Sequence, residues 1–196
     1  MMDGTRRSFD LEAIRADFPI LSREVHGKPL VYLDSAASAQ KPAQVLDALM
    51  SAYQDTYANV HRGLHFLSEA STDLYEAVRG KVAGFIGAAS GDEIVLTSGA
   101  TMSLNLIARC WAQPRLQPGD EILISIAEHH ANIVPWQMVA EATGARVRAF
   151  TLEDDGAFSM ARLKAEMSER TRIISVPHVS NVLGTVFPAV SYTHLT

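Results

Sequence analysis

Hydrophobic and polar positions alternate regularly in the second half of the chain. Short apolar runs of strand length are each followed by a longer segment with apolar residues at helical spacing. The runs predict strands at 94–96, 122–124, 146–150 and 172–176, and the amphipathic segments predict helices at 101–111, 133–142 and 159–167. Strands that alternate with helices predict an α/β fold, with a mainly parallel sheet and helices on both of its faces.

The first half of the chain has a less regular pattern. It predicts an N-terminal arm at 1–30, which contains a short helix at 10–17 and a turn at 27–29. A strand at 30–33 follows, and then two longer helices, one from Pro42 onward and one at 72–86. Pro42 suits the first turn of a helix because its φ is already fixed near the helical value. Gly87 is expected to cap the last helix at its C-terminus.

The composition narrows the class of protein. Of 196 residues, 47% are hydrophobic and 20% are charged, which is typical of a chain that folds around a core. The net charge is −5 without any block of five like charges, so no nucleic-acid partner is expected. The apolar runs are too short for a membrane span, and no secretory signal is expected. The single cysteine, Cys110, is expected in the core, and its isolation favours a reducing, cytoplasmic location.

Polar clusters follow three of the predicted strands, at the edge where parallel sheets bind ligands. After 94–96, Gly99 and Thr101 begin a helix whose free amides suit a phosphate, although an ordinary helix cap has the same pattern. After 172–176, Asn181 offers a donor and an acceptor to a ring oxygen, or else bonds to its own turn. These side chains suit a flat, phosphorylated cofactor.

The remaining cluster, after 122–124, holds Glu128, His129 and His130. His129 is placed to stack its ring on a planar cofactor. The alternatives are a polar surface turn and a zinc-dependent hydrolase. Adjacent histidines point in different directions and no metal-binding spacing is present, so no metal is expected.

Five segments in order resemble a known family: residues 32–42, 59–63, 98–101, 128–136 and 178–185. The chain resembles the N-terminal part of a Suf-type cysteine desulfurase, within the class V aminotransferase family of fold type I. The resemblance implies an incomplete large domain at 31–190 that binds pyridoxal 5′-phosphate (PLP), preceded by the arm at 1–30. The tail at 191–196 does not match the family and is expected to be an artefact.

That family removes sulfur from L-cysteine to give L-alanine and an enzyme-bound persulfide, which it passes to an acceptor protein of iron–sulfur cluster assembly. The intact parent is expected to be a cytoplasmic homodimer with PLP as its cofactor. A selenocysteine lyase or another class V PLP enzyme has the same motifs and is the enzyme alternative. A non-catalytic, truncated half-domain is the alternative of a different class.

The resemblance also implies roles for residues on the cofactor side of the site. Ala100 and Thr101 would hold the phosphate of PLP. His129 would stack on the pyridine ring and act as the catalytic residue that moves protons. Asn181 would contact the 3-oxygen of the ring.

On the substrate side, the resemblance places Ala36 and Ala37 near the substrate carboxylate, and His61 and Arg62 at the mouth of the site. The Schiff-base lysine and the nucleophilic cysteine of the family lie beyond Thr196, so this chain alone is expected to be inactive. The lysines that are present lie in turns or on polar helix faces, where a solvated charge is expected. They are Lys28, Lys41, Lys81 and Lys164.

Overall fold

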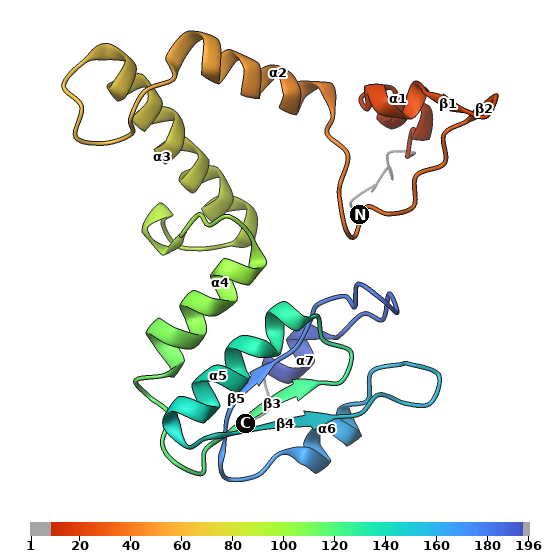
Figure 1. The fold of residues 1–196 in the computed structure, drawn as a ribbon, viewed down its shortest axis with the longest axis vertical. Coiled ribbons are helices and arrows are strands. Elements are labelled where there is room, and N and C mark those ends of the chain that lie inside the picture. The colour runs from red at the N-terminus through yellow and green to blue at the C-terminus, as the bar shows by residue number, and fades with distance from the viewer. Residues whose placement is uncertain (1–8, 194–196) are drawn as a thin grey trace, which may run out of the picture. The chain divides into compact units, whose positions relative to one another are not determined.

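The structure is a computed structural model that describes residues 9–193, and it divides into two compact units. Unit 1 covers Met1–Val95 and unit 2 covers Leu96–Thr196 (Figure 1). The described helices of unit 1 are α1 (Leu11–Ala16), η1 (Pro19–Ser22), α2 (Ala43–Ser51), η2 (Ala52–Thr56), α3 (Phe66–Ile86) and η3 (Gly91–Glu93), and its strands are β1 (Glu24–Val25) and β2 (Lys28–Pro29).

Local sequence signals explain the ends of the first elements of unit 1. The helix predicted at 10–17 is confirmed as α1, and the Asp10 side chain caps it by accepting the Ala13 N–H at 3.0 Å. β1 and β2 pair as an antiparallel hairpin, with His26 and Gly27 both at positive φ in the connecting turn. The helix expected after Pro42 is α2, although Pro42 itself is the N-cap and not part of the first turn.

The start of α3 was predicted too late. α3 begins at Phe66, and polar side chains in its first turns obscured the helical pattern. The Ser68 hydroxyl donates to the Asn59 carbonyl at 2.7 Å, and the Thr72 hydroxyl accepts the His61 N–H at 2.9 Å. These residues therefore face the preceding loop and hold it in place. Gly87, at φ 75°, caps the helix as predicted.

Two predicted strands, 30–33 and 94–96, are wrong. The Leu30 N–H donates to the Arg23 carbonyl. Residues 31–33 have no strand partner among the described residues. Ile94 is buried, but its N–H donates to the Gly91 carbonyl and its carbonyl accepts from the Arg79 guanidinium at 3.2 Å. The backbone of Ile94 is thus used by a turn and a side chain, because no neighbouring strand is available.

Unit 2 has the predicted mainly parallel α/β architecture. Its described elements are α4 (Ala100–Leu106), η4 (Ile107–Ala112), β3 (Glu121–Ser125), η5 (His130–Asn132), α5 (Val134–Thr143), β4 (Arg146–Phe150), α6 (Met160–Glu166), β5 (Thr171–Ser175) and α7 (Ala189–Thr193). The sheet has the order β4-β3-β5, and both pairings are parallel. The strands predicted at 122–124, 146–150 and 172–176 are therefore confirmed.

Side chains of β3 alternate between two apolar cores, so helices cover both faces of the sheet as expected. Ile122 and Ile124 point to the face covered by η4 and α5, while Leu123 points to the face covered by α6. The buried residues packed on the first face include Ala108, Ala112, Trp136 and Val139. Those on the second are Phe150, Leu152, Leu163 and Phe187. Burial of each large apolar side chain contributes about 1.5–3 kcal/mol.

A closed charge network lies at the amino end of β3. Glu121, which is only 3% exposed, accepts hydrogen bonds from the Ser168 hydroxyl at 2.7 Å and from the guanidinium groups of Arg148 at 3.1 Å and Arg170 at 3.4 Å. The Ser168 hydroxyl and Arg148 hold the pKa of Glu121 below its ordinary value, although burial acts in the opposite direction. The carboxylate at this edge is fully partnered and has a structural role.

Cys110 is a further correction. It was expected in the core, but it lies exposed on η4, whose buried positions are Ala108 and Ala112. Cys110 lies two residues from each of them and so on the opposite side of the helix. The apolar character of the segment does not identify which side packs on the sheet. Among the described residues, no helix combines the length and the apolar character needed to cross a membrane.

The core that contains α6 gives a test of unit 2. Leu163→Ala removes a completely buried side chain, so the free energy of unfolding should fall by about 2–5 kcal/mol. Urea unfolding followed by tryptophan fluorescence measures this loss, since Trp111 and Trp136 both lie in unit 2. The neighbouring Lys164→Ala is the control, because Lys164 is exposed and its replacement should change stability by less than about 0.5 kcal/mol. Equal effects of the two substitutions would contradict the assignment of Leu163 to the core.

Candidate functional site

The start of α4 presents unpaired polar groups, as the phosphate hypothesis requires. Gly99 precedes the helix at φ 149°, a conformation that favours glycine, and its carbonyl accepts the Ser103 N–H at 3.1 Å. Ala100 and Thr101 form the exposed first turn, where backbone amides have no carbonyl partner within the helix. The Thr101 hydroxyl makes no hydrogen bond to any residue between 9 and 193, so it is available to a ligand.

His129 lies in the loop after β3, and its ring is fixed by the local backbone. Its Nδ1 accepts the N–H of Ala131 at 3.1 Å, so in the neutral ring the proton resides on Nε2. The side chain is exposed, and the ring of His130 meets it edge-on at 6.4 Å between centroids. His129 therefore presents a ring face and an Nε2–H group outward from the end of β3.

Asn181 lies in the tip of a hairpin at 178–187 that follows β5. The Ser180 N–H donates to the Thr185 carbonyl, and the Phe187 N–H donates to the His178 carbonyl at 2.8 Å. Phe187 is completely buried in the α6 core and anchors the hairpin to the sheet. The exposed Asn181 side chain has no hydrogen-bond partner within the described part of the chain. The alternative in which Asn181 bonds to its own turn is therefore not observed.

The chain's topology brings these three positions to the same edge of unit 2. α4 contacts η5 and η4 contacts α5, so the segment α4–η4 runs in the same direction as α5, and α4 lies beside η5, which directly follows His129 (Figure 1). β5 pairs directly with β3, and Ser175 lies opposite Ile124. The hairpin with Asn181 therefore leaves the sheet next to the same loop, which is the carboxyl edge expected for a ligand.

Glu128, immediately before His129, is the one charged group at this edge with a strongly shifted pKa among the described residues. Its Oε1 is buried without a hydrogen-bond partner within 9–193. Burial raises the pKa of Glu128 to about 7, against the opposite influence of the Asn132 side chain and the His129 N–H. The carboxyl group therefore exchanges its proton near neutral pH, unlike the partnered Glu121.

Ala36 and Ala37, the predicted substrate residues, lie in an exposed turn of unit 1. The Ala37 N–H donates to the Asp34 carbonyl at 3.2 Å, and the Tyr32 hydroxyl donates to the Ser38 carbonyl at 2.6 Å. Tyr32 thus holds both sides of the turn, a role that the sequence analysis did not assign. Its position at the start of the matched segment 32–42 was the available signal.

His61 and Arg62 adopt left-handed backbone conformations, at φ 57° and 53°. This conformation costs of order 1 kcal/mol for each non-glycine residue, and such strain is concentrated at functional sites. The next residue must be glycine, because a Cβ on Gly63 would lie 2.0 Å from the Ser68 hydroxyl oxygen. His61 packs edge-on against Tyr75, while the Arg62 guanidinium has no partner among residues 9–193. Arg62 is therefore available to an anionic group.

The predicted cofactor residues all lie in unit 2, whereas the four predicted substrate residues all lie in unit 1. Within the described part of the chain, no three side chains of the His, Cys, Asp and Glu types gather as a metal site would require. Glu128, His129 and His130, the residues of the hydrolase alternative, therefore do not form such a group.

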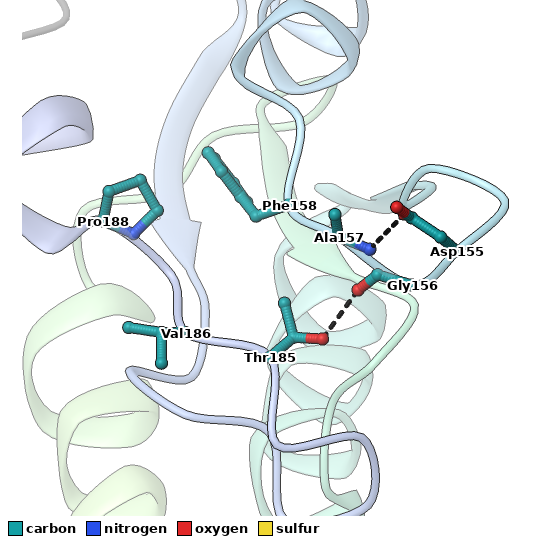
Figure 2. A pocket seen from close by; sticks show the side chains of 7 residues that line it. All are labelled: Asp155, Gly156, Ala157, Phe158, Thr185, Val186 and Pro188. Carbon is teal, nitrogen blue, oxygen red and sulfur yellow. Dashed lines mark hydrogen bonds between the residues drawn. The ribbon is translucent and has the colours of Figure 1, made fainter.

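A separate pocket of about 530 Å³ lies between the loop that follows β4 and the hairpin at 178–187. Figure 2 shows Asp155, Phe158 and Thr185 on its walls, and the Thr185 hydroxyl donates to the Gly156 carbonyl at 2.6 Å. Asp155 accepts the N–H of Ala157 at 2.9 Å, so its carboxylate shapes the turn. None of the predicted site residues is among the described residues that line this pocket.

A parallel α/β sheet with unpaired polar groups at its carboxyl edge defines a class of proteins that bind ligands beyond their strand ends. Within that class, one family matches most of this chain. Residues 31–195 match the family described as aminotransferase class-V, and the chain belongs to this family.

Curated relatives and solved structures agree with this family. A cysteine desulfurase from Pectobacterium atrosepticum is 53% identical over 92% of this chain and 44% of its own length. A crystal structure of a cysteine desulfurase from Escherichia coli superposes with a TM-score of 0.79 at 42% identity, over 95% of this chain and 46% of that one. One from Thermococcus onnurineus gives 0.80 at 35% identity, over 90% and 42%. The resemblance is confirmed, and the chain spans less than half the length of these relatives.

The shifted Glu128 predicts how stability depends on pH. Because its pKa in the folded chain is about 7, above the ordinary 4.5, its contribution to stability is greatest below pH 4.5 and is lost as the pH rises through 7. Glu128→Gln should therefore match the wild type at pH 5 and be more stable by about 1 kcal/mol at pH 8, once solvent screening of this half-buried group is included. Chemical denaturation at the two pH values measures the difference.

Glu141→Gln is the matched control, because Glu141 is exposed on α5 and its replacement should have the same small effect at both pH values. A stability difference for Glu128→Gln that does not change between pH 5 and pH 8 would contradict the assignment.

Proposed function

We propose that this chain is the PLP-binding part of a cysteine desulfurase. The observation that supports the proposal is that α4 contacts η5, directly after His129, and that β5, which leads to Asn181, pairs with β3, in a chain 53% identical to a cysteine desulfurase. Each of the three presents a polar group without a partner in the described chain, and together they offer what a phosphorylated planar ring needs.

The residues present fit PLP in charge and shape. The free amides of the first α4 turn and the Thr101 hydroxyl would hold the phosphate, since a helix start favours anions. The exposed ring of His129 would lie against the pyridine ring, and the Asn181 amide would donate to the ring's 3-oxygen. When bound, PLP supplies the electron sink for cleavage of the carbon–sulfur bond of L-cysteine.

The proton chemistry assigned to this chain belongs to His129. Because its Nδ1 is occupied by the Ala131 N–H, the ring gives or takes a proton only through Nε2, which points outward. In unit 1, the unpartnered Arg62 guanidinium suits the carboxylate of the substrate, and the turn at Ala36 and Ala37 offers a site without bulky side chains. These groups bind and orient the substrate.

The same proposal extends to the partner, the oligomeric state and the location of the whole protein. Its sulfur would pass to an acceptor protein of iron–sulfur cluster assembly, and the intact parent would act as a homodimer in the cytoplasm. The lone cysteine of this chain supports a reducing compartment.

The cofactor site is tested by binding of pyridoxine 5′-phosphate, which has no aldehyde and therefore cannot react with surface lysines. Thr101→Val removes only the hydroxyl and should weaken binding about tenfold or more, as expected for a hydrogen bond to a charged group. His129→Ala should also weaken binding, whereas the adjacent His130→Ala is the control and should not. Titration calorimetry measures all four affinities. Equal affinity of the wild type, Thr101→Val and His129→Ala would refute the site.

A second test concerns catalysis by the chain on its own. All four lysines are exposed, and the Lys41 ammonium donates to the Ala39 carbonyl. A lysine that reacts with a carbonyl needs burial or a cationic neighbour to lower its pKa, and no lysine here is buried. The chain mixed with PLP and L-cysteine should therefore release alanine no faster than PLP alone. Alanine quantified by chromatography checks this, and protein-dependent turnover would show that one of these lysines suffices.

A further inference from the structure

One buried side chain joins the loop that holds His129 to the strand that leads to Asn181. Asn132 is 7% exposed and lies in η5, just beyond His129. Its Oδ1 accepts two hydrogen bonds, from the Trp136 indole N–H at 2.8 Å and from the Ser175 hydroxyl at 2.7 Å. These donors belong to α5 and to the last residue of β5, so three elements meet at a single oxygen atom.

This connection is built into the interior and does not depend on an exposed loop. Trp136 is 2% exposed, so its N–H has no access to water if Asn132 is removed. Ser175 is the point at which β5 ends and the chain turns toward the hairpin of Asn181. Any shift of η5 relative to β5 therefore breaks at least one buried hydrogen bond.

Asn132 also influences Glu128, the residue directly before His129. The Asn132 side chain favours the charged form of the Glu128 carboxyl group, against the larger effect of burial, which raises its pKa. Through its Oδ1, Asn132 joins η5, which directly follows His129, to α5 and β5.

We propose that Asn132 is a positioning residue that fixes the distance between His129 and the Asn181 hairpin, and thereby the affinity for a planar phosphorylated ring. The inference rests on the proposed function, because it assigns His129 and Asn181 to one ligand. Asn132 acts only through these two residues and does not touch the ligand. A residue that served packing alone would have no specific effect on ligand affinity.

The test uses the full 196-residue chain carrying Trp111→Phe, so that Trp136 is the sole tryptophan. Asn132→Ala removes the acceptor of both hydrogen bonds, and Ser175→Ala removes only the link to β5. Leu116→Ala is the control for lost stability, because Leu116 is buried in the segment that leads into the amino end of β3, at the opposite end of the strand from the His129 loop. Ultraviolet resonance Raman spectra report the hydrogen bonding of the Trp136 indole without any ligand, and calorimetry with pyridoxine 5′-phosphate reports affinity.

We expect Asn132→Ala to lose the hydrogen-bonded indole signature and to bind pyridoxine 5′-phosphate about tenfold more weakly. Ser175→Ala should keep the indole signature and lose about threefold in affinity. Leu116→Ala should bind within twofold of the reference despite its lower stability. In a double-mutant cycle, Asn181→Ala should cost less affinity in the Asn132→Ala background than in the reference, because the two residues act together.

The outcomes separate this inference from the proposed function. If Thr101→Val, His129→Ala and Asn181→Ala weaken binding but Asn132→Ala and Ser175→Ala do not, the inference is overturned and the function stands. If none of the first three weakens binding, the function fails and the inference fails with it. Additive losses in the cycle, or an equal loss for Leu116→Ala, reduce Asn132 to a structural residue. Should Asn132→Ala not fold, Ser175→Ala decides by the same comparison.

Discussion

Parallel pairing of β3 with a strand on each side is the constraint on which the rest of unit 2 depends. All five residues of Glu121–Ser125 are buried, and their backbone groups are used by β4 on one side and β5 on the other. A strand held on both sides and covered on both faces cannot slide without exposing apolar side chains to water. Its carboxyl end is therefore a fixed point from which the His129 loop begins.

The two ends of β3 differ in how their polar groups are satisfied. At the amino end, Glu121 has partners for both oxygens, so its charge stabilises the fold and is not available for chemistry. At the carboxyl end, Glu128 has a buried oxygen without a partner in the described chain, and Thr101, His129 and Asn181 present groups outward. A buried polar atom without a partner is costly in a folded chain, and among residues 9–193 Glu128 Oε1 is such an atom at the edge where parallel sheets bind ligands.

Unit 1 holds its candidate residues in a loop with strained backbone conformations, whereas unit 2 holds its candidate residues around a sheet. His61 and Arg62 remain in left-handed conformations because the loop around them is tied to α3 through Ser68 and Thr72. Gly63 makes this possible, since any side chain there would collide with Ser68. The polar first turns of α3 therefore position a guanidinium group that has no partner in the described chain.

The sequence by itself determined the three strands of the sheet and the segments that carry Thr101, His129 and Asn181, because apolar runs and the polar residues that follow them are local patterns. It did not determine that 94–96 lacks a strand partner, or that Cys110 is exposed on a π-helical turn. Nor did the sequence determine the hydrogen bond from the Ser175 hydroxyl to the Asn132 side chain, because these residues are 43 positions apart in the chain. The choice of a hydrogen-bond partner depends on which elements pack together, and only the tertiary structure fixes that.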